Sequence, residues 1–102
     1  MLRITIQPSS NGTTLKLEGK VSGPWVQDLE RFWQRVRENA VHRPVRVDMT
    51  SVLLVDWDGS RVLKGMQEDG AELMGEDSFI KSMIDNGDEW ERSIEKKRTG
   101  SG

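Results

Sequence analysis

Apolar residues recur along this chain at two alternating spacings, and this alternation restricts the possible folds more than any other feature. Residues 2–6 and 15–17 place an apolar side chain at every second position, which is the period of half-buried strands. Between these two stretches, Asn11-Gly12 suits a tight turn because both residues tolerate a positive φ. An antiparallel hairpin is therefore expected at the start of the chain.

The spacing of apolar residues then changes to that of a helix. Pro24 suits a first helical position, because its fixed φ angle is helical and its missing N–H has no partner to lose there. The apolar residues that follow at helical spacing, and that we expect to face the core, are Trp25, Leu29, Phe32, Trp33 and Val36. An amphipathic helix of about three to four turns is predicted here.

Two further strands and two further helices are predicted after Pro44. A third strand covers residues 45–49, and the apolar run at 52–55 close behind it indicates a buried strand end. A second helix follows residue 59 and ends near Gly70, and residues 71–74 form a short fourth strand. A third helix, which Asn86-Gly87 ends, carries the apolar residues Phe79, Ile80, Met83 and Ile84.

The resulting order is strand, strand, helix, strand, helix, strand, helix, which defines an α/β fold. Strands that alternate with single helices favour parallel pairing through right-handed crossovers. We therefore predict a small mixed β-sheet with helices packed on it, in which the opening hairpin is the antiparallel part. Residues 1–87 form this domain, and residues 88–102 form a charged C-terminal tail, partly helical or disordered, with only Trp90 and Ile94 apolar.

The charge and composition of the chain argue against several classes of function. The formal net charge is −2, and 15 basic residues are scattered among 17 acidic ones, so nucleic acid is not an expected partner. The absence of cysteine excludes disulfides and thiolate chemistry and fits the cytoplasm. The N-terminal residues lack the long apolar stretch of a signal peptide or a membrane span, so neither export nor membrane insertion is expected.

Four short motifs follow one another in an order and spacing typical of one protein family. They are LKLEGKV at residues 15–21, VRVDMTSV at 45–52, VDWDG at 55–59 and GAEL at 70–73. Through them, residues 19–84 resemble the STAS family, named for sulfate transporters and anti-sigma factor antagonists. The resemblance implies a STAS-like fold and a bacterial, cytoplasmic signalling protein. Such a protein regulates transcription by docking onto an anti-sigma factor with an ATP-binding, kinase-like fold, and a sigma factor is released in consequence.

The resemblance also assigns a partner-binding site. The residues that match the family's switch loop are Asp56, Trp57, Asp58, Gly59 and Ser60. In the bacterial antagonists of the family a phosphorylatable serine immediately precedes the glycine, and Asp58 stands at that position here. Trp57 replaces a residue that is commonly small in the family. Its side chain is either tucked beneath the loop or displayed as a binding anchor.

Asp58 carries a charge but no hydroxyl group. Because a glycine and a helical pattern follow it, we expect Asp58 to be the N-cap of the second helix. Its single charge compares with about −1.5 to −2 on a phosphoserine, so aspartate is a partial mimic of the phosphorylated state. We expect the phosphorylation switch to be lost, the alternative being its transfer to Ser60, Thr50 or Ser51.

Two other functions remain open from the sequence. A STAS domain can instead be an accessory or regulatory domain of a transport machine or of a stressosome-like assembly. Residues 52–60 are also similar to the first motif of haloacid-dehalogenase-type phosphatases, in which Asp56 would be the nucleophile and Asp58 the acid/base, both holding magnesium. Only 43 residues follow Gly59, and they lack the later lysine and carboxylate motifs of such enzymes.

No enzymatic activity, metal or cofactor is therefore expected, and the expected partner is a protein. The single histidine, His42, is expected in a solvated loop. The sequence leaves the oligomeric state open.

Overall fold

Two strands open the chain and form the antiparallel hairpin that the sequence predicts. A computed structural model describes residues 1–39 and 44–85, and the structural statements below apply to them. Strand β1 (Leu2–Ser9) pairs with strand β2 (Gly12–Val21), and Ser9 lies opposite Gly12. The turn is therefore made by Ser10 and Asn11, and the expected Asn11-Gly12 turn pair is wrong by one position.

Gly12 is required for a reason other than the turn. Its φ is +141°, and a Cβ atom built on it would lie 2.4 Å from the carbonyl oxygen of Pro44. The same carbonyl accepts a hydrogen bond from the Thr13 N–H at 3.0 Å, which fixes the close approach of the two segments. Any side chain at position 12 would disturb the start of the pairing between β2 and the third strand.

Helices then alternate with strands in the predicted order. Helix α1 (Trp25–Asn39) is followed by strand β3 (Val45–Val55), helix α2 (Trp57–Glu68) and strand β4 (Glu72–Met74), and residues 78–85 are helical. The sheet order is β1-β2-β3-β4, with β3 parallel to both β2 and β4. The structure is thus the expected small α/β domain with a mixed sheet.

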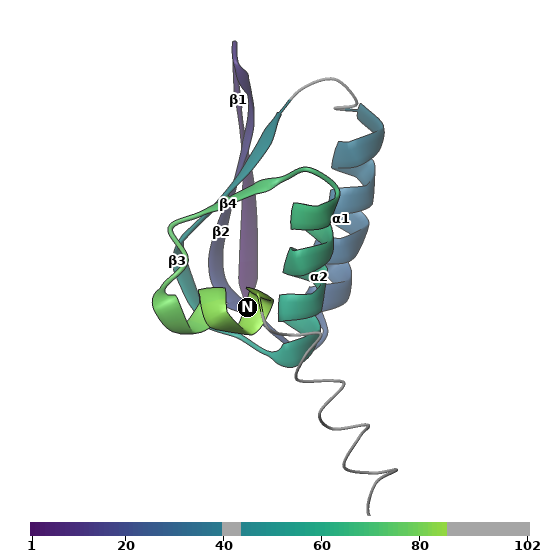
Figure 1. The fold of residues 1–102 in the computed structure, drawn as a ribbon. Coiled ribbons are helices and arrows are strands. Elements are labelled where there is room, and N and C mark those ends of the chain that lie inside the picture. Colours follow the sequence, from purple (N-terminus) through teal and green to yellow (C-terminus); the bar gives the residue numbers. More distant parts are fainter. Residues whose placement is uncertain (40–43, 86–102) are drawn as a thin grey trace, which may run out of the picture.

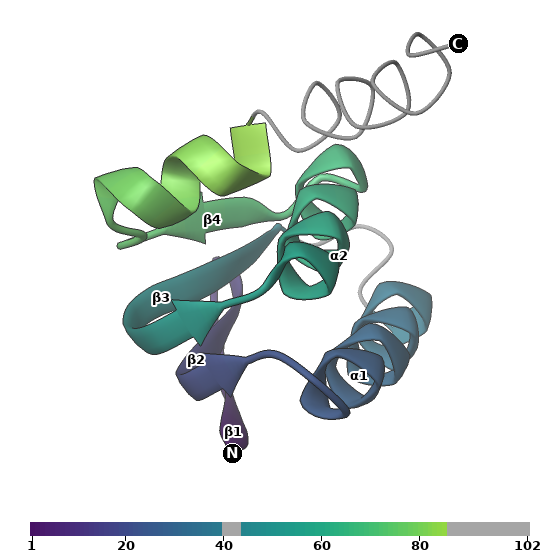
Figure 2. The same cartoon turned by 90° about the horizontal axis from the view of Figure 1, so that it is seen from below.

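The helices are distributed unevenly around the sheet (Figures 1 and 2). Helices α1 and α2 cover one face, with α1 over the β1 and β2 side and α2 over the β3 and β4 side. The helix of residues 78–85 lies on the β4 side, away from β1. Among residues 1–39 and 44–85, every helix is too short or too polar to cross a bilayer.

The core fills the layer between the sheet and these helices. Its fully buried side chains include Leu15, Leu17, Val47 and Met49 from the sheet and Leu29, Leu63 and Met66 from the helices. Of the α1 residues expected in the core, Leu29 and Trp33 are buried, whereas Phe32 and Val36 are half-buried at the margin of the core. Trp25, at the first turn of α1, is also half-exposed, so its predicted core position is wrong.

The end of β3 differs most from the sequence prediction. Residues 45–55 form one strand, and the predicted burial of its end is only partly right: Val55 is buried, but Leu53 is 78% exposed and Leu54 is 49% exposed. The pairing register explains this: Gly19 lies opposite Val52 and Lys20 opposite Leu54, so Leu53 is an extra residue without a partner in β2. Such a bulge interrupts the alternation of side chains between the two faces.

The C-terminal part of the described chain is helical over residues 78–85, as predicted. Of the apolar residues of this helix, Ile80, Met83 and Ile84 are buried and Phe79 is 74% exposed. The expected helix stop at Asn86-Gly87, the tail at residues 88–102 with Trp90, and His42 lie outside the described residues.

Candidate functional site

The residues that match the family's switch loop lie where β3 passes into α2. We call Asp56, Trp57, Asp58, Gly59 and Ser60 the β3–α2 junction. Only Asp56 connects the two elements, since β3 ends at Val55 and α2 already begins at Trp57. The Asp56 N–H donates to the carbonyl of Val21 at 3.2 Å, so the chain stays attached to β2 as it leaves the sheet.

Asp56 is the N-cap of α2, and the prediction that Asp58 has this role is wrong. The backbone of Asp56 is extended, with φ −88° and ψ 179°, and its Oδ1 accepts a hydrogen bond from the Gly59 N–H at 2.7 Å. Asp58 lies within the first helical turn, so its backbone no longer has the extended conformation of a cap. Both aspartates precede helical residues, and only the backbone conformation distinguishes them.

The second carboxylate oxygen of Asp56 bonds a distant segment. Its Oδ2 accepts a hydrogen bond at 2.9 Å from the N–H of Gly23, which lies in the connection between β2 and α1. One side chain therefore joins the start of α2 to the start of α1. With both oxygens engaged by backbone N–H groups, Asp56 is poorly arranged to act as a nucleophile toward phosphate.

Gly59 allows α2 to start directly against the end of β2. A Cβ atom built on Gly59 would lie 2.2 Å from the carbonyl oxygen of Val21. That contact is with backbone, so an alanine at this position would push the first turn of α2 away from the sheet. The glycine next to Asp58 is thus explained by packing.

The hydroxyl groups near the junction differ in accessibility. Ser60 is 2% exposed, and its Oγ donates to the carbonyl of Trp57 at 2.8 Å. Thr50 is exposed, and its Oγ1 donates to Asp48 Oδ1 at 2.7 Å, whereas Ser51 is half-buried. A kinase could reach the Ser60 hydroxyl only if the first turn of α2 opened.

Exposed apolar side chains gather beside the junction. Trp57 is 42% exposed, so its indole is displayed in part and not tucked away, and Asp58 next to it is exposed. Leu53 and Leu54 add two exposed apolar side chains within the same short stretch. We call Leu53, Leu54 and Trp57 the junction patch. The sequence analysis did not assign the leucines to the site, although four consecutive apolar residues on a sheet with one covered face were a signal that some must face solvent.

A groove of about 490 Å³ runs between α1 and α2, with Asp58 and Arg61 among its lining residues. At the far end of α2, Asp69 Oδ2 accepts a hydrogen bond from Trp33 Nε1 at 2.9 Å and pairs with Arg37 at 3.3 Å. Nothing lies within 4 Å of a Cβ atom built on Gly65, so this glycine keeps the groove open. The groove therefore extends from the junction along the whole contact between the two helices.

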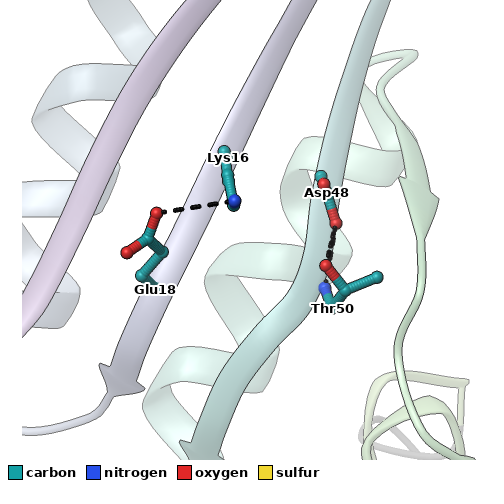
Figure 3. Close-up of polar contacts among 4 residues, drawn as sticks. All are labelled: Lys16, Glu18, Asp48 and Thr50. Carbon is teal, nitrogen blue, oxygen red and sulfur yellow. Dashed lines mark hydrogen bonds and ion pairs between the residues drawn. The ribbon is translucent and has the colours of Figure 1, made fainter.

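The face of the sheet opposite α1 and α2 is polar (Figure 3). Lys16 Nζ lies 3.8 Å from Glu18 Oε1, and Asp48 Oδ1 accepts hydrogen bonds from the N–H and the Oγ1 of Thr50 at 2.9 and 2.7 Å. These two bonds from Thr50, the backbone one foremost, together with the positive charge of Lys16, hold the pKa of Asp48 below its ordinary value of 3.8, against the opposing effect of burial. This face has the alternating charges of a solvated surface.

Neither a search for metal-binding groups nor a comparison with known proteins assigns a further role to the site. Over residues 1–39 and 44–85, no three or more His, Cys, Asp or Glu side chains are grouped so that they could hold a metal ion. No protein-family model matches the sequence, and no curated protein matches it significantly.

The division of roles between the two aspartates is testable by stability. Asp56→Ala removes both carboxylate bonds and should lower the free energy of unfolding by about 2 kcal/mol, as expected for a lost N-cap with a second backbone partner. Asp58→Ala removes only a favourable charge from the first turn of α2 and should cost about 0.5 kcal/mol. Urea unfolding of both variants at neutral pH measures the difference, and equal losses would contradict the assignment of the cap.

The hydrogen bonds on Asp48 make a pH-dependent contribution to stability. Because its pKa is lowered by folding, Asp48 stabilises the fold above the pKa of the unfolded chain, and this stabilisation is lost as the pH falls through the lower folded value. In an NMR titration, Thr50→Val should raise the pKa of Asp48 part of the way back, since the backbone bond remains. Thr5→Val on strand β1 is the control and should leave it unchanged. If Thr50→Val also has no effect, the hydroxyl bond does not form in solution.

Proposed function

We propose that this domain is a protein-binding regulatory module of the STAS type that docks onto a kinase-like anti-sigma factor through the β3–α2 junction. The order of elements supports the proposal, because an opening antiparallel hairpin is followed by two parallel crossovers. In this arrangement the residues that match the family's switch loop lie at the end of a sheet strand and at the start of a helix. The proposed localisation is the cytoplasm, as for the bacterial antagonists that the sequence resembles.

The junction patch is the observation that carries the proposal. Three large apolar side chains are exposed within residues 53–57, next to an aspartate whose side chain also faces solvent. Tryptophan is among the residues that most often carry the binding energy of a protein interface. Since the Asp56 carboxylate fixes the base of the patch through two backbone bonds, docking would require little ordering of the chain.

In this proposal, Asp58 gives the junction a constant charge where the antagonists of the family switch theirs. It is exposed in the first turn of α2, and it is not needed as the cap because Asp56 has that role. The neighbouring hydroxyl of Ser60 is buried and already donates a hydrogen bond. The affinity for the partner would then be set by the sequence and not by phosphorylation.

The absence of an accessible hydroxyl in the junction favours a second candidate as well. A STAS domain that is never phosphorylated could serve as an accessory domain of a transport machine or of a stressosome-like assembly. The junction patch would then hold a fixed contact with another component. The two candidates share the surface and differ in the partner.

Titration calorimetry against a purified kinase-like anti-sigma factor tests the docking surface. Trp57→Ala removes the aromatic side chain of the patch and should weaken binding by at least about tenfold. Phe79→Ala is the control, because it removes another exposed aromatic side chain, 74% exposed against 42% for Trp57, from the helix of residues 78–85. Equal losses for the two variants, or none for Trp57→Ala in a complex that forms, would exclude the junction as the docking site.

The same titration with Asp58→Ser measures how the negative charge of Asp58 affects the affinity for the partner. Because Asp58 does not cap α2, the variant should fold normally and any change in affinity reports contact with the partner. If the carboxylate repels the partner as a phosphate would, serine should strengthen binding. Weaker binding would show that Asp58 is an attractive contact, and the comparison with a phosphoserine would then be wrong.

A further inference from the structure

Strand β1 has one side without a neighbour in the sheet. It is the first strand in the order β1-β2-β3-β4, and within the described residues no strand pairs with its outer side. Unpaired N–H and C=O groups along such an edge are a template for another strand. The side chains of β1 and the direction of its backbone N–H and C=O groups indicate which strand could pair with this edge.

The hydrogen-bond pattern of the hairpin shows which residues of β1 direct their backbone N–H and C=O groups away from β2. The Lys20 N–H donates to the Met1 carbonyl at 3.0 Å, so Met1 and Lys20 form a hydrogen-bonded pair of the hairpin. In an antiparallel ladder, hydrogen-bonded pairs alternate with non-hydrogen-bonded pairs. The backbone groups of the odd-numbered residues of β1 therefore bond to β2, and those of the even-numbered residues point away from β2. The outward N–H groups belong to Leu2, Ile4 and Ile6. Pro8 is also an outward position, where its missing N–H breaks no bond to β2.

An apolar margin of the core follows the same edge. Leu2 and Ile4 are half-buried against the core, and Ile6 is 50% exposed. On α1, Phe32 and Val36 are half-buried in the same way. They lie on the flank of α1 turned away from the groove with α2, and α1 lies over the β1 side of the sheet (Figure 2). The layer between sheet and helix is thus left open along β1.

We propose that a second copy of this chain covers this edge, with the two β1 strands paired antiparallel about a twofold axis at Ile4. Ile4 then lies opposite Ile4 of the other copy, and Leu2 lies opposite Ile6. Every outward N–H between residues 2 and 6 meets an outward carbonyl, and no donor is required from Pro8. Arg3, the one charged residue of β1, faces Thr5 of the other copy and not another arginine.

A second copy fits this edge better than a single extended peptide does. A peptide would pair with β1 but leave the flank of α1 open. A second copy contributes its own α1 across the twofold axis. Because neighbouring strands are about 4.8 Å apart, two helices that each cover β1 and β2 would lie at about 10 Å, within the usual distance for packed helices. Phe32 and Val36 of the two copies would then pack against one another.

The proposal is independent of the proposed function. The β3–α2 junction lies at the end of β3, and β2 separates β3 from β1. A twofold dimer of this kind would carry two junctions, each still exposed.

Sedimentation equilibrium of the full chain tests the proposal over concentrations from about 1 µM to about 1 mM, which span weak to moderate affinities. The mass should rise toward twice the 11.6 kDa of one chain. Ile6→Lys introduces a charge at the outward edge and should raise the dissociation constant at least about tenfold. Phe79→Lys is the control, because it places the same charge at an exposed apolar position in the helix of residues 78–85, on the β4 side of the sheet. It should leave the dissociation constant unchanged. A mass of 11.6 kDa at every concentration, or equal effects of the two lysines, would overturn the proposal.

Amide exchange in the unmodified chain gives a second readout that does not depend on the folding of a variant. The Thr5 N–H bonds to β2 and should be protected at all concentrations. The Ile4 and Ile6 N–H groups face outward and should become protected only as the concentration rises. Self-association without this added protection at Ile4 and Ile6 would mean that another surface is used, and the proposal would be wrong.

Discussion

The carboxylate of Asp56 is the interaction on which the β3–α2 junction depends. One of its oxygens receives the N–H of Gly59 and the other that of Gly23, 33 residues earlier in the chain. The connection from β2 to α1 and the start of α2 are therefore held by one side chain. The close approach of Gly59 to the Val21 carbonyl is possible only while α2 begins at this point. Without the bridge, the first turn of α2 would have neither its cap nor its fixed position on the sheet.

Around this bridge, neighbouring residues of the junction divide into engaged or buried ones and exposed ones. Asp56, Gly59 and Ser60 have their polar groups engaged or their surfaces buried, so they build the junction. Trp57 and Asp58 lie between Asp56 and Gly59 and remain exposed. A short sequence can thus present an aromatic ring and a charge from a rigid base, which suits binding because few groups must be ordered when a partner arrives.

The sequence was informative where structure is local and less so where it depends on contacts between distant segments. The hairpin and the order of strands and helices follow from apolar spacing and turn residues, whereas the cap of α2 lies two residues before the predicted one. The choice of Asp56 over Asp58 as cap depends on where the backbone changes from extended to helical, and the second bond of Asp56, from the N–H of Gly23, comes from a segment that no spacing rule brings there. The exposure of Leu53 results from a bulge against β2, and a bulge shifts the register without a mark in the sequence. Half-burial of Phe32 likewise depends on which strand ends the sheet.

The central claim, that one carboxylate holds both connections, is tested most directly by amide exchange at Gly23 and Gly59 in the unmodified chain and in Asp56→Asn. An asparagine has a single side-chain oxygen that can accept these bonds, because its amide nitrogen is a donor. The account predicts that both amides are protected in the unmodified chain and that one of them loses its protection in the variant, while amides inside β2 keep theirs. A Gly23 amide that exchanges as fast in the unmodified chain as in an unfolded peptide would contradict the account.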